Sequence, residues 1–315
     1  MVLDLLEKSL PFAGIASFMN LPYTRNLQGA DLVIAGVPFD GGTFYRPGAR
    51  FGPRAIREQS VYASEFQPVY PWDYSLTERF TLIDFGDIAP LPASGGMELM
   101  LELTEAVAQD VFKAGAGLLT LGGDHTIPYG PIRAAAKHHG KLALIHLDAH
   151  QDSIGSDQIA PGSRFINHGT FASDLVTEGC IDPVHSSQVY IRTHMPPVPG
   201  DGYQIFYANE ALQFLPEVLA ETIKARVGNM PVYLTLDIDA LDPSFAPGTG
   251  TPVPGGPTSA DVRRFLKALD GLNIVAADIV EVSPVYDPSQ TTAITAAFLA
   301  IDLLYLLGSA YKNRS

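Results

Sequence analysis

The segment LALIHLDAHQD, residues 142–152, joins a buried-strand pattern to a group of metal-binding residue types. Its first six residues are apolar except His146, and continuous apolar runs are typical of strands that are covered on both faces in a parallel sheet. Directly after this run come Asp148, His150 and Asp152, at positions i, i+2 and i+4. Because alternate side chains of an extended chain point the same way, we expect these three to converge at the strand end.

Apolar runs of the same kind recur along the chain and alternate with segments of helical periodicity. The predicted strands cover residues 32–38, 80–85, 117–121, 142–147, 188–191, 232–236 and 273–282. The predicted helices cover residues 97–113, 132–139, 209–227, 258–269 and 292–307. This alternation predicts an α/β fold of three layers, with a mostly parallel central sheet flanked by helices. No repeat or linker divides the chain, so we expect a single domain over residues 1–315.

The composition argues against several classes of protein. With 46% hydrophobic residues the chain can bury a large core. Its 20 basic and 34 acidic residues give a formal net charge of 20 − 34 = −14, which argues against a nucleic-acid partner. The apolar run 293–307 is shorter than the about 20 residues of a membrane span and contains Asp302, so we expect a buried helix and no membrane partner. A single cysteine, Cys180, and a start without a basic leader predict a reducing, cytoplasmic location.

Two further strand ends carry metal-binding residue types. GLLTLGGDH (117–125) ends in His125, and LTLDID (234–239) contains Asp237 and Asp239. A lone Asp at a strand end is usually a turn or cap residue, but four carboxylates and two imidazoles in this spacing favour metal binding. Their charge of −4 would balance two divalent cations, and thiol-free, carboxylate-rich ligation suits Mn²⁺. Two ions roughly 3.5–4 Å apart can share and activate a water.

Several motifs are similar to those of the ureohydrolase family of arginases and agmatinases. The central ones are GGDH (122–125), DAHQD (148–152), DIDALDPSFAPGTGTPVPGG (237–256) and DIVEVSP (278–284). Those that resemble agmatinase segments in particular are GVPFDGGTFYRPGARFGPRAIR (36–57), INHGTF (166–171), IDPVHSSQVYIRT (181–193) and MPVYLTLDID (230–239). The resemblance covers nearly the whole chain, is closest to bacterial agmatinases, and implies an arginase-like fold.

The resemblance also implies a site and an activity. It implies two Mn²⁺ ions per subunit, ion A held by His125, Asp148, Asp152 and Asp237, and ion B held by His150, Asp148, Asp237 and Asp239. A metal-bridging hydroxide would attack the guanidinium carbon of agmatine, a small cationic substrate, and release urea and putrescine. Glu281 matches the family's guanidinium-binding carboxylate, and His168 matches its proton-transfer histidine. A homo-oligomer, trimer or hexamer, is implied by the family alone.

Elementary chemistry agrees with these two roles. A carboxylate can hold a planar guanidinium through two hydrogen bonds, and a loop histidine with a pKa near 6.5 can carry a proton to the departing amine. A zinc deacetylase of related fold would need fewer ligands, and a non-catalytic relative would be expected to lack at least one of them.

The choice of guanidino substrate stays open at this point. The alternatives are 4-guanidinobutanoate and 3-guanidinopropanoate, whose tails are anionic, and a pocket-facing Arg164 or Arg192 would favour them. The Pro-rich segment 194–200 lies where family members contact the substrate's tail. Gln151 stands where relatives commonly have a smaller residue, and by alternation its side chain should point away from the metals.

Overall fold

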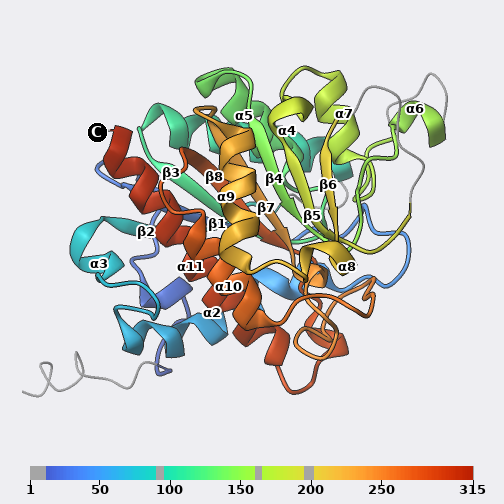
Figure 1. Cartoon of the computed structure of the whole chain (residues 1–315). Coiled ribbons are helices and arrows are strands. Elements are labelled where there is room, and N and C mark those ends of the chain that lie inside the picture. Colours follow the sequence, from blue (N-terminus) through green and yellow to red (C-terminus); the bar gives the residue numbers. More distant parts are fainter. Residues whose placement is uncertain (1–11, 90–95, 160–164, 195–201, 315) are drawn as a thin grey trace, which may run out of the picture.

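The computed structural model describes residues 12–89, 96–159, 165–194 and 202–314. These residues contain one eight-stranded sheet with the order β2-β1-β3-β8-β7-β4-β5-β6, and every pairing is parallel (Figure 1). The strands are β1 Leu32–Val37, β2 Leu82–Asp87, β3 Gly117–Gly122, β4 Ala143–Leu147, β5 Ser187–Ile191, β6 Gln204–Tyr207, β7 Val232–Asp237 and β8 Ile274–Val280. The predicted α/β class and parallel sheet are confirmed.

Helices cover both faces of the sheet, which makes three layers. One face packs against α4 (Gly96–Lys113), α5 (Tyr129–His139) and α7 (Phe171–Thr177) (Figure 1). The other face packs against α2 (Gly52–Ala63), α9 (Pro216–Val227), α10 (Ser259–Ala268) and α11 (Thr291–Arg314). The short helices are α3 Leu76–Arg79, α6 Ser156–Ile159 and α8 Ala208–Ala211. Short 3-10 turns are η1 Phe18–Asn20, η2 Ala49–Phe51, η3 Ser64–Phe66, η4 Pro183–His185, η5 Ile238–Ala240 and η6 Pro284–Tyr286.

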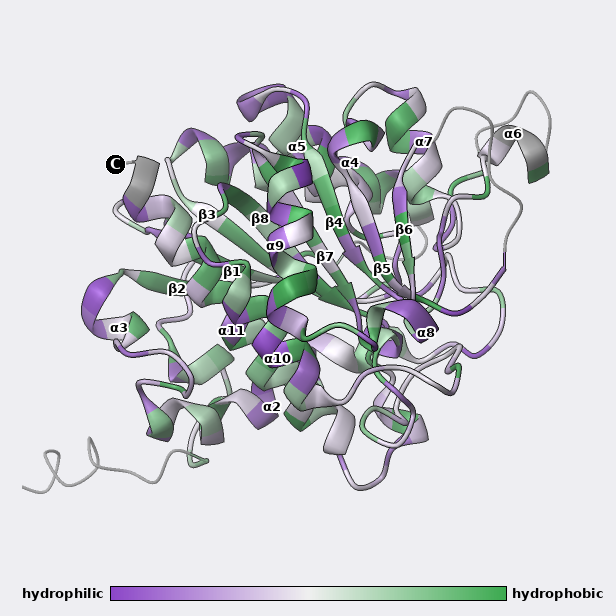
Figure 2. Ribbon diagram, in the orientation of Figure 1, coloured by the Kyte–Doolittle hydropathy of each residue, from purple (hydrophilic) through white to green (hydrophobic). Residues whose placement is uncertain are grey.

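The interior strands are buried on both faces, as their sequences predict. Every residue of β1, β3, β4, β5, β7 and β8 is buried. Figure 2 shows this as hydrophobic strands in the middle of the molecule and hydrophilic segments such as α3 and α8 at its periphery. With both faces of the sheet covered, its carboxyl edge is where loops can form a site.

Three local predictions were incomplete. The strand β6 was missed because it is a short edge strand that is exposed at Gln204 and only half-buried beyond it. The helix predicted over 209–227 is two helices, because Pro216 begins α9 and holds Leu215 in an extended conformation. The helix α2 was also missed; the turn at Ala49–Phe51 leads directly into it.

The last helix, α11, is longer than predicted and is buried. The segment Thr291–Lys312 is long and apolar enough to cross a membrane, but 78% of its most apolar window is buried inside the protein. The predicted run 293–307 was therefore too short, and the packing of α11 shows that it is a core helix. Within it, Asp302 accepts hydrogen bonds from Trp72 Nε1 at 2.8 Å and from Arg263 Nε at 2.7 Å.

Replacement of Asp302 by alanine should destabilise the protein strongly. The change leaves the Arg263 guanidinium and the Trp72 N–H without their buried partner, and breaking such a pair costs on the order of 3–5 kcal/mol. Urea unfolding measures the loss. The matched control is Asp110→Ala, which removes an exposed ion pair to Lys113 and should change the free energy of unfolding by less than about 1 kcal/mol. Equal effects of the two changes would contradict a core role for Asp302.

Candidate metal centre

The candidate ligands follow the ends of strands that are neighbours in the sheet. The sheet order places β3, β8, β7 and β4 side by side. His125 follows β3, Asp148 follows β4, Asp237 ends β7, and Glu281 comes directly after β8. Because the strands are parallel, all four side chains belong to the same edge of the sheet.

His125 lies at the centre of the first cluster. Its Nδ1 is 3.0 Å from Asp148 Oδ2, 3.1 Å from Asp152 Oδ2 and 3.2 Å from Asp237 Oδ2. This nitrogen is buried and has no hydrogen-bond partner among the described residues. Three carboxylate oxygens around one ring nitrogen are the expected surroundings of a cation that all four atoms would bind. The structure thus brings together the four residues predicted for ion A.

The second cluster shares Asp148 with the first. His150 Nδ1 is 3.3 Å from Asp148 Oδ1 and 3.1 Å from Asp239 Oδ2. One carboxylate therefore faces His125 with one oxygen and His150 with the other, as a residue that bridges two ions must. The predicted second bridge, Asp237, faces His125 with Oδ2 and accepts the Asp239 N–H at 2.8 Å with Oδ1. Its bridging role stays a prediction.

The backbone brings these side chains together by turns rather than by strand alternation. β4 ends at Leu147, and His150 N–H donates to Asp148 Oδ1. In the same way Asp239 N–H donates to Asp237 Oδ1 within the η5 turn. Such Asx turns explain the i, i+2 spacing, so the extended conformation expected for residues 148–152 was wrong. Asp152 has a φ of +47°, which confirms that the chain turns there.

The electrostatics of the cluster show an excess of negative charge. Burial and the charges of Asp239 and Asp148 raise the pKa of Asp237 well above its ordinary value. Burial also opposes charge on His125, yet the carboxylates around it raise the pKa of its imidazole well above the usual range. Buried carboxylates this close together need a cation to remain ionised, and a divalent metal supplies more charge than a proton.

Glu281 and His168 lie beside the clusters. Glu281 Oε1 accepts hydrogen bonds from the His125 main-chain N–H at 3.0 Å and from His168 Nδ1 at 3.0 Å. Burial would lower the pKa of His168, but its hydrogen bond to Glu281 and the charge of that residue raise the pKa to about 9. The two residues predicted to bind the guanidinium and to move a proton thus contact each other next to His125.

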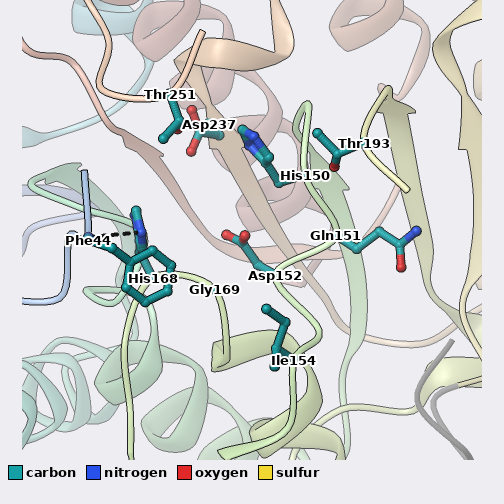
Figure 3. Close-up of a pocket in the computed structure, with 10 residues that line it drawn as sticks. All are labelled: Phe44, His150, Gln151, Asp152, Ile154, His168, Gly169, Thr193, Asp237 and Thr251. Atoms are coloured by element: carbon teal, nitrogen blue, oxygen red, sulfur yellow. Dashed lines mark hydrogen bonds between the residues drawn. The ribbon is translucent and has the colours of Figure 1, made fainter. Parts of the chain in front are cut away.

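A cavity of about 260 Å³ opens onto this centre. Figure 3 shows the carboxylates of Asp152 and Asp237 and the ring of His150 around it. Its lining residues are Phe44, His150, Gln151, Asp152, Ile154, His168, Gly169, Thr193, Asp237 and Thr251. Gln151 points away from His150 and Asp152, as predicted (Figure 3).

Phe44 is a site residue that the sequence did not single out. Its ring meets the His168 ring edge-on, with 4.5 Å between the ring centroids, and its N–H is 3.4 Å from His168 Nε2. The loop that carries it is tied down because Gly42 N–H donates to Asp124 Oδ2 at 2.7 Å. A Cβ at Gly42 would lie 2.1 Å from Thr126 Oγ1, so this close approach requires glycine. The sequence placed Phe44 within the motif 36–57 but offered nothing that distinguished it from its neighbours there.

Two arginines near the cavity, Arg46 and Arg192, donate to main-chain oxygens and so give no indication of a site for an anionic substrate tail. Arg192 donates to the main-chain oxygens of Tyr190, Ala240 and Val253, which binds it to the loop after β7. Arg46 is held in the same way by the main-chain oxygens of Thr249 and Gly250. Arg164 and most of the 194–200 segment lie outside the described residues.

This chain is similar to known proteins over nearly its whole length. A model described as the arginase family matches residues 30–305. An agmatinase from Klebsiella pneumoniae subsp. pneumoniae is 43% identical over 286 residues, which are 91% of this chain and 89% of the relative.

Two solved structures are similar in sequence and in fold. A hypothetical agmatinase from Burkholderia thailandensis has a TM-score of 0.90 at 42% identity, with 97% of this chain and 94% of that one covered. Proclavaminate amidino hydrolase from Streptomyces clavuligerus has a TM-score of 0.87 at 37% identity, with 96% and 100% covered.

Replacement of Asp148 by asparagine should abolish tight binding of divalent metal. The amide keeps one oxygen but loses the charge, so it cannot serve both clusters; we expect Mn²⁺ affinity to fall at least about 100-fold. Competition with a coloured chelator measures this. The control is Asp242→Asn, three residues after the predicted ligand Asp239, whose carboxylate accepts hydrogen bonds from the main-chain N–H groups of Ser244 and Gly255. Undiminished Mn²⁺ binding by Asp148→Asn would refute the bridging assignment.

Proposed function

This chain belongs to the arginase family, and on that premise we propose that it is a hydrolase that converts agmatine and water to putrescine and urea. The observation that carries the proposal is the cavity itself. Two His/Asp clusters that share Asp148 lie at this cavity, and the Glu281 carboxylate, our proposed anchor for a guanidinium, lies beside them. Several relatives at 43–44% identity that are named agmatinase support agmatine as the substrate.

The metal would be held by the residues already described. We propose two Mn²⁺ ions, one at the cluster around His125 and the other at the cluster around His150. Such a pair of ions supplies a water of lowered pKa and hence a nucleophile at neutral pH. The donor set fits this group because it is rich in carboxylates and contains no thiol, which suits Mn²⁺ better than a structural zinc ion.

The guanidinium would be oriented by Glu281. Glu281 is buried, and its backbone has a φ of +63°. Its main-chain N–H stabilises this conformation by donating to Gly123 O at 2.8 Å. A guanidinium that donates two hydrogen bonds to a fixed carboxylate is held in one plane, and its carbon is then fixed relative to the clusters. Glu281 thereby connects substrate position to the turn that carries His125.

His168 would provide the proton that the departing amine needs. With its pKa raised to about 9 beside Glu281, this imidazole takes up a proton more readily than a free histidine does. It lies at the wall of the cavity beside Phe44 (Figure 3), where a leaving amine can reach it. A general acid in this position typically contributes 10²–10⁴-fold to rate.

The walls of the cavity favour a cationic tail over an anionic one. None of the ten lining residues in the described part of the chain is Lys or Arg. The nearby Arg46 and Arg192 donate to main-chain oxygens of loops. An anionic tail would therefore lose water without gaining a Lys or Arg partner among the described lining residues, whereas an ammonium benefits from the surrounding negative charge.

Three further features are proposals. We propose Mn²⁺ as the resident metal, a cytoplasmic location and a homo-oligomeric state. The single cysteine and the acidic composition are in keeping with the location, and family resemblance supports the oligomer.

A substrate panel tests the proposed reaction. We expect Mn²⁺-loaded protein to release urea from agmatine with a kcat/KM at least about tenfold above that for 4-guanidinobutanoate, 3-guanidinopropanoate or arginine, since each competitor has a carboxylate to desolvate. Asp148→Asn is the inactive control. Preference for a carboxylate-bearing substrate would overturn the substrate but not the reaction. No urea from any of the four, with metal bound, would refute the proposed function.

Replacement of Glu281 by glutamine should weaken guanidinium capture and leave metal binding intact. A neutral amide loses the charge-assisted pair, so kcat/KM for agmatine should fall about 100-fold. The matched control is Glu217→Gln on the exposed surface of α9, which should behave as wild type. An unchanged kcat/KM for Glu281→Gln would show that another group anchors the guanidinium.

A further inference from the structure

A row of polar side chains crosses the otherwise apolar sheet just below the candidate metal centre. The row consists of in-register neighbours on β3, β8, β7, β4 and β5, namely Thr120, Asp278, Thr235, His146 and Gln188. All five are at most 1% exposed. Because paired residues of neighbouring strands point to the same face, they form one line, which we call the polar row. The metal ligands Asp237 and Asp148 come two positions further along β7 and β4, on the same face.

Thr235 connects the polar row to His125. Its hydroxyl donates to Asp278 Oδ1 at 2.6 Å and lies 2.7 Å from His125 Nε2. A hydroxyl has one proton, and that of Thr235 is donated in the hydrogen bond to the Asp278 carboxylate. The Thr235 oxygen must therefore accept a hydrogen bond from the Nε2–H of His125. The network therefore places a proton on Nε2, so that Nδ1 is the nitrogen that would bind a metal ion. Nδ1 faces the three carboxylate oxygens of the first cluster.

His146 connects the polar row to the bridging carboxylate. Gln188 Nε2 also contacts the main-chain oxygen of Gln151, so this end of the amide must be the donor. It donates to His146 Nδ1 at 3.1 Å, which leaves the imidazole proton on Nε2, 2.8 Å from Asp148 Oδ2. His146 thus donates a hydrogen bond to Asp148 and is not a further metal ligand, although its ring nitrogen lies close to the ligand atoms of the first cluster.

A purely structural polar row would not need this arrangement. Buried polar groups without partners cost about 1–3 kcal/mol each, so pairing within the row would be enough to satisfy the fold. Here one chain of hydrogen bonds ends at His125 and the other at Asp148. Each chain donates or accepts so that the ring nitrogen or carboxylate oxygen facing the cluster is left to bind a metal ion. Partners of this kind typically change metal affinity 10–100-fold.

We propose that the polar row positions the metal ligands: Asp278 and Thr235 fix the tautomer of His125, and Gln188 and His146 fix the orientation of Asp148. These four are positioning residues, since none of them reaches the cavity. The inference rests on the metal centre of the proposed function but not on the choice of substrate. It extends that function by explaining why Thr, Asp, His and Gln interrupt buried strands.

The test is Mn²⁺ affinity of the full chain, measured by chelator competition on metal-free protein, together with the thermal stability of the metal-free form. Thr235→Val keeps the shape and removes the hydroxyl; Thr235→Ser keeps the hydroxyl. We expect Thr235→Val to bind Mn²⁺ about 10–100-fold more weakly, and Thr235→Ser to bind within about threefold of wild type. The matched control is Thr120→Val, in the same row, whose hydroxyl makes no hydrogen bond to a cluster residue in the described part of the chain.

The outcomes separate the proposal from its alternatives. A structural role would lower the stability of metal-free Thr235→Val and leave its Mn²⁺ affinity unchanged, which would overturn the proposal. Equal losses of affinity in Thr120→Val and Thr235→Val would overturn it as well. Should Thr235→Val not fold, Gln188→Leu tests the other branch and should weaken Mn²⁺ binding about tenfold. If wild-type protein binds no Mn²⁺, the proposed metal centre itself fails.

Discussion

Three buried carboxylates around one imidazole lone pair are the constraint on which the rest of this structure depends. Asp148, Asp152 and Asp237 each place an oxygen within 3.2 Å of His125 Nδ1. Burial leaves little water to screen these charges, so a bound cation stabilises the arrangement. The turns that follow β3, β4 and β7 and the polar row beneath them are the means by which the chain holds these groups together.

The parallel sheet makes this concentration of charge possible. Its order brings β3, β8, β7 and β4 together although they are far apart in the sequence, and helices on both faces leave only the carboxyl edge for polar loops. The same edge receives the loop with Phe44 and the loop with Thr251, which complete the cavity. The Glu281 carboxylate, the proposed guanidinium anchor, lies beside His125, so the proposed metal centre and this carboxylate share one turn.

Most of the fold, and the grouping of the eight predicted site residues at one edge of the sheet, could be predicted from the sequence, because buried strands are continuous apolar runs and the predicted ligands follow them directly. The break before Pro216 was missed because the helical periodicity continues across it. The edge strand β6 was missed because four residues are too few to show a period. The i, i+2 spacing of Asp148 and His150 was attributed to strand alternation, which has the same period as the Asx turn that is present. Phe44 and the polar row depend on tertiary contacts, and neither has a local pattern.

Anomalous diffraction at the manganese edge, from crystals of the full chain grown with Mn²⁺, tests the central claim most directly. The account predicts two peaks roughly 3.5–4 Å apart, one beside His125 Nδ1 and the other beside His150 Nδ1, with Asp148 between them. A single peak, or peaks away from these two nitrogens, would contradict it.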